Sequence, residues 1–193
     1  MILPSTMVKF DLYFSSRFVT TPEKIRFGID NTVIAEQYLP IDSYSVSLEL
    51  SNGNHQFWVE LCDKSVDNEL RVNGELVGDT FIEIKNIAIN GSMMHYLLND
   101  NGYVIPDWDH HKDVAQWFLE NKGVVPEKID NSKYLNLKGK YFFNFSLPIK
   151  EFLDSKISID LAYAKFYNGS LDRYQQLKNR ILLKEYHDTK TTN

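Results

Sequence analysis

Apolar side chains alternate with polar ones along much of this chain, and a two-residue period is typical of β-strands that bury one face. The alternation is clearest from Val8 to Phe14, and it returns in several later segments. These segments lie at residues 24–29, 45–50, 56–61, 70–72, 141–147 and 157–163. Helical patterns do not separate the strands regularly, which argues against a doubly wound α/β fold.

One further segment, residues 80–89, changes phase in its middle. It carries two isoleucines in one register and then two in the opposite register: Ile82 and Ile84, then Ile87 and Ile89. Because a one-residue slip turns every side chain to the other face, a β-bulge near Lys85-Asn86 would direct all four into one core. We therefore predict about eight strands.

The turns agree with antiparallel pairing. Five of the nine glycines follow an asparagine, and Asn-Gly suits the positive φ angles of a tight hairpin. Asn52-Gly53 stands between two clean strand patterns, so we predict a hairpin there. Together these features predict a mostly β protein, an antiparallel β-sandwich of jelly-roll type.

Two regions depart from the strand pattern. Residues 92–139 lack clear strands and form a predicted insertion, with a short helix from Val114 to Lys122 that Asp113 caps and Gly123 ends. Residues 169–193 predict an amphipathic C-terminal helix and tail, following a sandwich domain over 1–168. The apolar stripe of this helix, a candidate partner-binding surface, consists of Leu171, Tyr174, Leu177 and Ile181.

Composition excludes several classes of protein. With 43% hydrophobic and 24% charged residues, the chain can form a core, and its net charge of −5 argues against nucleic acid as the main partner. The single cysteine, Cys62, excludes an internal disulfide and a zinc site built from several thiolates. The sequence shows neither a signal peptide nor an apolar stretch long enough to cross a membrane, so we expect no membrane insertion.

The aromatic residues suggest a binding surface. Trp58 shares the polar face of its predicted strand with Gln56 and Glu60, and Tyr103 and Trp108 lie in the insertion. The three aromatic residues could form a platform on which a sugar ring stacks. The alternative is that Trp58 lies in a protein interface, where aromatic residues are also enriched.

Two clusters of acidic residues could bind calcium or catalyse glycan hydrolysis. Asp63, Asp67 and Asp79 offer carboxylates of the kind that calcium prefers, although their spacing is not that of an EF-hand. Asp107 and Asp109 could serve a glycan hydrolase, but the segment around them also reads as a solvated loop that leads into a helix. No nucleophile elbow, phosphate loop or dinucleotide fingerprint is present.

One stretch of sequence resembles known families. Residues 79–91 have the form Asp-x-x-Ile-x-Ile-x-x-Ile-x-Ile-Asn-Gly, and they are followed by Tyr103 and Pro106. This pattern is similar to jelly-roll modules that bind plant polysaccharides with calcium. It also resembles small β-sandwich proteins of tailed phages, including marine cyanophages, which the later residues 143–149 and Phe152-Leu153 fit as well.

These resemblances imply a non-enzymatic protein with no cofactor, or with calcium. Our main hypothesis is a phage virion component, made in the host cytoplasm, which decorates the particle or acts as an adhesin. It would bind other virion proteins or further copies of itself as a homo-oligomer. The first alternative is a carbohydrate-binding module, and the second is a carboxylate-dependent glycan hydrolase.

Overall fold

The computed structural model describes residues 4–64, 69–73, 75–95, 97–98 and 101–156. The chain divides into two compact units, Met1–Phe145 and Ser146–Asn193. The described strands are β1 (Ser5–Arg17), β2 (Lys24–Ile29), β3 (Thr32–Tyr38), β4 (Ser43–Ser51), β5 (Gly53–Leu61), β6 (Leu70–Val72), β7 (Glu75–Gly78), β8 (Phe81–Ile89), β9 (Ser92–Met93), β10 (Gly102–Pro106), β11 (Ile129–Asp130), β12 (Tyr134–Leu135) and β13 (Gly139–Leu147), and helix α1 is Lys112–Lys122.

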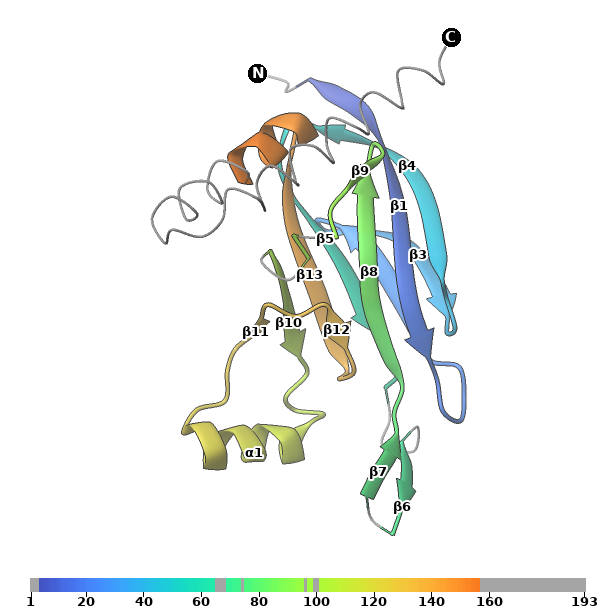
Figure 1. Cartoon of the computed structure of the whole chain (residues 1–193), viewed down its shortest axis with the longest axis vertical. Helices are drawn as coiled ribbons and strands as arrows, with labels where there is room; N and C mark the ends of the chain where they lie inside the picture. Colours follow the sequence, from blue (N-terminus) through green and yellow to red (C-terminus); the bar gives the residue numbers. More distant parts are fainter. Residues whose placement is uncertain (1–3, 65–68, 74, 96, 99–100, 157–193) are drawn as a thin grey trace, which may run out of the picture. The chain divides into compact units, whose positions relative to one another are not determined.

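The strands form two main sheets and one small hairpin. Sheet A has the order β12-β8-β1-β4, with β9 also paired to β8, and sheet B has the order β11-β10-β13-β5-β2-β3. Among the described residues, strands β6 and β7 form a separate two-stranded sheet. Neighbouring strands run antiparallel, and Figure 1 shows β8, β1 and β4 side by side. The prediction of a mostly β, antiparallel sandwich is confirmed.

The two sheets enclose an aromatic core. Phe10 of sheet A meets Phe145 of sheet B edge to face, with ring centroids 5.7 Å apart. Phe27 of sheet B contacts both Phe14 and Tyr44 of sheet A, at 6.1 and 4.7 Å. Each of these strands therefore presents one apolar face inward, as the alternation predicts.

The bulge in β8 is confirmed. Tyr13 of β1 pairs with Asn86 and Phe14 pairs with Ile84, so Lys85 is the extra residue. The four isoleucines of β8 are fully buried, while Lys85 is exposed. The slip in the sequence pattern thus marks the place where the strand must bulge to keep one face in the core.

The predicted hairpin at Asn52-Gly53 is wrong. Strand β4 pairs with β1 in sheet A, whereas β5 pairs with β2 in sheet B, so this turn carries the chain from one sheet to the other. Alternation identifies the buried face of a strand, but two strands that face each other across a core show the same pattern as two that pair. Asn90-Gly91, with φ angles of 48° and 78°, does join the paired strands β8 and β9.

The region 92–139 contains more structure than the sequence indicates. It includes the short strands β9, β11 and β12 and also β10, which pairs with β13 inside sheet B. Helix α1 begins two residues earlier than predicted, with His111 rather than Asp113 at its N-cap. Its predicted end is confirmed, because Gly123 adopts a left-handed conformation and donates its N–H to Leu119 O.

In the second unit, residues 149–156 are helical. Phe152 N–H donates to Pro148 O at 3.3 Å, and Ser155 Oγ donates to Phe152 O at 2.7 Å. The predicted strand at 157–163, the boundary at 168 and the C-terminal helix lie outside the described residues, and so do the four residues of its apolar stripe. No helix among the described residues is long and apolar enough to cross a membrane.

Candidate functional site

The candidate site is the outer face of sheet B, the face turned away from the core. On β5 the apolar side chains of Phe57, Val59 and Leu61 are buried, so the intervening side chains point outward. Neighbouring strands add their own outward residues. We define the outer face of sheet B by Arg26, Gln56, Trp58, Glu60, Tyr103, Lys140, Phe142 and Asn144.

Gln56 joins three strands at the centre of this face. Its Nε2 donates to Tyr103 Oη on β10 and to Asn144 Oδ1 on β13, both at 2.9 Å. These two bonds use both Nε2 hydrogens, and three polar groups keep further capacity: Gln56 Oε1 as an acceptor, and Asn144 Nδ2 and Tyr103 O–H as donors. The arrangement can therefore both accept and donate hydrogen bonds to a bound molecule.

An aromatic pair lies beside these amides. Tyr103 and Phe142 are cross-strand partners, and their rings stack with centroids 5.2 Å apart and an interplanar angle of 25°. Both side chains are half-buried. The ammonium of Lys128 lies 5.0 Å from the Tyr103 ring, so one part of the site combines apolar ring surface with a cation.

Trp58 lies on this face but is only 6% exposed. Its indole packs over Gly28, where any Cβ would overlap with the ring. Its Nε1 donates to Asp30 O at 2.9 Å, and Lys140 Nζ lies 4.8 Å from the ring centroid. Trp58 is therefore a fixed part of the surface that supports the residues around it.

The charges on the outer face occur in pairs. Glu60 lies 3.9 Å from Arg26 and 3.7 Å from Lys140, and Arg26 also lies 3.1 Å from Glu36 of β3. Lys128 is paired with Asp130 at 2.8 Å. These cations are therefore largely neutralised within the protein.

A hydrogen-bonded cluster at one end of β5, with buried His55 and exposed Asp30, holds the site in place. Asp30, with φ of 53°, accepts hydrogen bonds through its carboxylate from His55 Nδ1 at 2.8 Å and from Gln56 N–H at 2.9 Å. The other His55 nitrogen bonds to Ser51 O at 2.8 Å. The sequence did not indicate this link, because 25 residues separate His55 from Asp30 and no spacing rule connects them.

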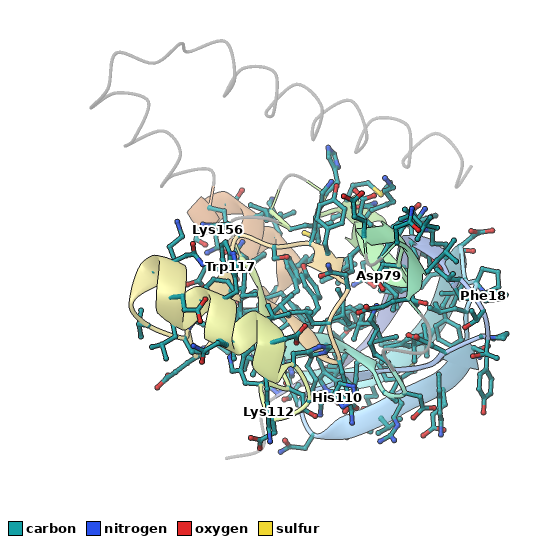
Figure 2. All side chains as sticks on the ribbon, turned by 90° about the horizontal axis from the view of Figure 1, so that it is seen from below. Phe18, Asp79, His110, Lys112, Trp117 and Lys156 are labelled. Atoms are coloured by element: carbon teal, nitrogen blue, oxygen red, sulfur yellow. The ribbon has the colours of Figure 1, made fainter. Side chains whose placement is uncertain are left out.

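Of the three predicted platform residues, two lie on the outer face and one contacts the insertion helix. Tyr103 accepts a hydrogen bond from Gln56, which lies two residues before Trp58 on β5. Trp108 donates its Nε1 hydrogen to Pro126 O at 2.8 Å and meets Phe118 of α1 edge to face at 5.6 Å. Trp108 thereby packs against α1. In Figure 2 this helix can be found by its labelled residues Lys112 and Trp117.

The polar cluster at 107–113 mainly forms the turn before α1. Asp107 Oδ1 accepts from His110 N–H at 3.2 Å, and Asp107 Oδ2 lies 3.6 Å from Lys138 Nζ. His111 Nε2 accepts from Lys138 N–H at 2.7 Å, and burial lowers the pKa of this imidazole below its usual value. Asp109 is exposed. These contacts favour the loop interpretation over a pair of catalytic carboxylates.

The proposed calcium ligands are partly engaged elsewhere. The Asp79 carboxylate accepts a hydrogen bond from Lys64 Nζ, whose side chain is only 2% exposed. Asp63 is exposed, and Asp67 lies outside the described residues. Within the part of the chain that the structure describes, no group of three His, Cys, Asp or Glu residues could hold a metal ion. Calcium binding stays a prediction.

No family model and no curated protein matches this sequence. Two solved structures are similar to it, and both are of vCBM60; the first comes from work on two families of calcium-dependent carbohydrate-binding modules. The selenomethionine form is 13% identical with a TM-score of 0.45, covering 70% of this chain and 89% of that one. The complex with galactobiose is 12% identical with a TM-score of 0.41, covering 72% and 99%. Likeness of this extent says nothing about what this chain binds.

Proposed function

We propose that this protein is a carbohydrate-binding module whose ligand lies across the outer face of sheet B. The observation that carries the proposal is the half-buried Tyr103–Phe142 pair beside the amides of Gln56 and Asn144. Sugar rings present apolar C–H faces and a rim of hydroxyl groups. Aromatic surface suits the first, and amide groups that both donate and accept suit the second.

Three of the residues have distinct roles in this proposal. Phe142 supplies apolar surface, and Tyr103 supplies both ring surface and a hydroxyl donor. Asn144 supplies two N–H donors, held in place because its Oδ1 accepts from Gln56. Trp58 stays packed between Gly28 and Lys140, and its bond to Asp30 O holds the indole in place.

The test is a binding measurement with soluble polysaccharides. The full chain is run in native gels that contain xylan, galactan, mannan or β-glucan, and the polysaccharide that retards it is then titrated by calorimetry. We expect Tyr103→Ala to raise Kd at least about tenfold, since losing a central aromatic contact costs more than about 1.4 kcal/mol. Asn144→Ala should weaken binding less, through the loss of its donors.

Tyr13→Ala is the matched control. Tyr13 is an exposed tyrosine on the outer face of sheet A, so its replacement should leave Kd unchanged. Equal effects of the two tyrosine variants would contradict the proposed site, and so would the absence of retardation in every gel. Titrations in calcium and in EDTA should agree, because amides and a hydroxyl form this site; loss of binding in EDTA would place the site elsewhere.

The main hypothesis of a phage virion component stays a prediction. Its candidate partner surface is the helix stripe from Leu171 to Ile181, which lies outside the described residues. Deleting residues 170–193 tests it. A folded monomer that no longer assembles would support the hypothesis, whereas unchanged assembly would contradict it.

A further inference from the structure

The free edge of β4 is the longest unprotected strand edge among the described residues. Strand β4 has nine residues and is the last strand of sheet A, next to β1 and on the side away from β8. Figure 1 shows it at this edge of the sheet. A long edge strand exposes backbone N–H and C=O groups that can pair with another chain.

The other edge strands of both sheets are short or bulged, and both features disfavour pairing with another chain. The opposite edge of sheet A is β12, and one edge of sheet B is β11, and each has only two residues. The second edge of sheet B, β3, bulges at Ile34, because Phe27 pairs with Ala35 and Gly28 pairs with Val33. Short strands and bulges are common protections. Strand β4 has no proline, no lysine and no register shift.

The hydrogen bonds of β1 show which backbone groups of β4 face outward. Phe14 N–H donates to Asp42 O and Asn52 N–H donates to Pro4 O, whereas Lys9 bonds to Asn90 on the other side of β1. Even-numbered residues of β4 therefore face β1, and the N–H and C=O groups of the odd-numbered residues point away from the sheet. The odd-numbered residues are Ser43, Ser45, Ser47, Glu49 and Ser51.

The side chains at this edge are also incompletely covered. Tyr44, Val46, Leu48 and Leu50 point toward the core but are only half-buried, whereas Val8, Phe10 and Leu12 of the adjacent β1 are almost fully buried. An added strand along β4 would cover these four apolar side chains. The edge thus offers both unpaired backbone groups and apolar surface.

The sequence of β4 is complementary to itself in one antiparallel register. When Ser47 faces the Ser47 of a second copy, the inner pairs are Tyr44 with Leu50 and Val46 with Leu48. The outer pairs are Ser43 with Ser51 and Ser45 with Glu49, so no charge faces a like charge. A register centred on Glu49 would instead place two carboxylates opposite each other.

We propose that this protein forms a homodimer in which the β4 strands of two copies pair antiparallel about a two-fold axis at Ser47. The pairing joins the two copies of sheet A into one continuous sheet. The outward groups of the odd-numbered residues then form hydrogen-bonded pairs, each of which exchanges two bonds. The interface is symmetric, with the same strand on both sides. This proposal does not depend on carbohydrate binding, which is assigned to sheet B.

The first test is the mass of the full chain in solution. Light scattering and sedimentation are measured from about 1 μM to about 500 μM, a range that suits a small interface. We expect a dimer that dissociates on dilution. Ser47→Pro should raise the dimer Kd at least about tenfold, because it removes a central N–H donor from each copy. The Ser47 N–H does not bond to β1, so the fold should survive.

Two lysine variants test the register even if the proline variant fails to fold. Ser47→Lys places two like charges face to face at the axis and should raise Kd several-fold. Ser43→Lys adds the same charge but faces Ser51 of the other copy, so Kd should stay unchanged. Mixing Ser47→Lys with Ser47→Glu should restore dimers, as opposite charges then meet.

Two results would overturn the proposal. The first is a monomer over the whole concentration range. The second is a wild-type dimer that Ser47→Pro and Ser47→Lys leave intact. In the first case, a fall in the thermal stability of the monomer with Ser47→Pro would show that another segment of the same chain covers the edge.

Discussion

Replacing Gly28 by alanine should displace Trp58 and loosen the outer face of sheet B. A Cβ at residue 28 would overlap with the Trp58 ring on one side and with Thr32 O on the other. Neither can yield easily, because the indole is held by its hydrogen bond to Asp30 O and the Thr32 carbonyl belongs to the backbone of β3. We therefore expect the variant to be overpacked at this point.

The expected magnitude follows from two terms. Overpacking of a well-packed site costs about 1–3 kcal/mol, and the lost Nε1–H···O bond costs about 1 kcal/mol. The free energy of unfolding should thus fall by about 3 kcal/mol. For a chain of this length, such a loss lowers Tm by about 6–12 °C. Urea unfolding followed by far-ultraviolet circular dichroism measures the loss without relying on Trp58 as a probe.

A double-mutant cycle with Trp58→Leu tests the cause. The smaller side chain removes one of the two overlaps, so Gly28→Ala should cost at least about 1 kcal/mol less in that background. Gly91→Ala is the control: its added Cβ meets no atom within 4 Å, although φ is 78°. It should cost about 1–2 kcal/mol for the left-handed backbone alone, with no coupling to Trp58. A fully additive cycle for Gly28 would refute the packing argument.

Three further predictions concern buried charges. Burial is the main reason that the pKa of His111 lies below its ordinary value. The unfolded chain therefore binds the proton more tightly than the folded protein does. The wild-type protein should lose stability relative to His111→Gln as pH falls below about 6.5. Burial raises the pKa of Glu83, but hydrogen bonds, first from Lys133, lower it more, so the pKa is below its ordinary value. Glu83→Gln should lower the free energy of unfolding by about 2 kcal/mol at pH 7. This difference in stability between the wild-type protein and the variant should vanish as pH falls below the lowered pKa. Urea unfolding at a series of pH values measures both effects. A stability difference between variant and wild type that does not change with pH would contradict these two predictions. Lys64→Met should destabilise the fold by leaving the Asp79 carboxylate without its lysine partner. Adding Asp79→Asn to this variant should restore part of the lost Tm. If it restores none, the Lys64–Asp79 pair contributes little to stability.

The proposed site explains why sequence reasoning found some of its residues and not others. The polar face of β5 could be predicted, since Gln56 and Trp58 alternate with buried apolar residues. Phe142 was not predicted as a site residue, because one strand pattern cannot reveal that its neighbour across the sheet is Tyr103. Trp108 was predicted as a platform residue because it is aromatic, but it contacts α1 and Pro126 instead.

The sequence by itself determined those features that depend on neighbours along the chain. The period of two places one face of each main strand in the core, the phase slip requires the bulge at Lys85, and Gly123 ends the helix because it accepts a left-handed conformation. Only the tertiary structure decided which strands pair. Strands β4 and β5 carry equivalent patterns on either side of Asn52-Gly53 but belong to different sheets. The physical reason is that alternation records which face of a strand is buried, whereas pairing, and with it the outer face of sheet B and the free edge of β4, depends on contacts between segments far apart in sequence.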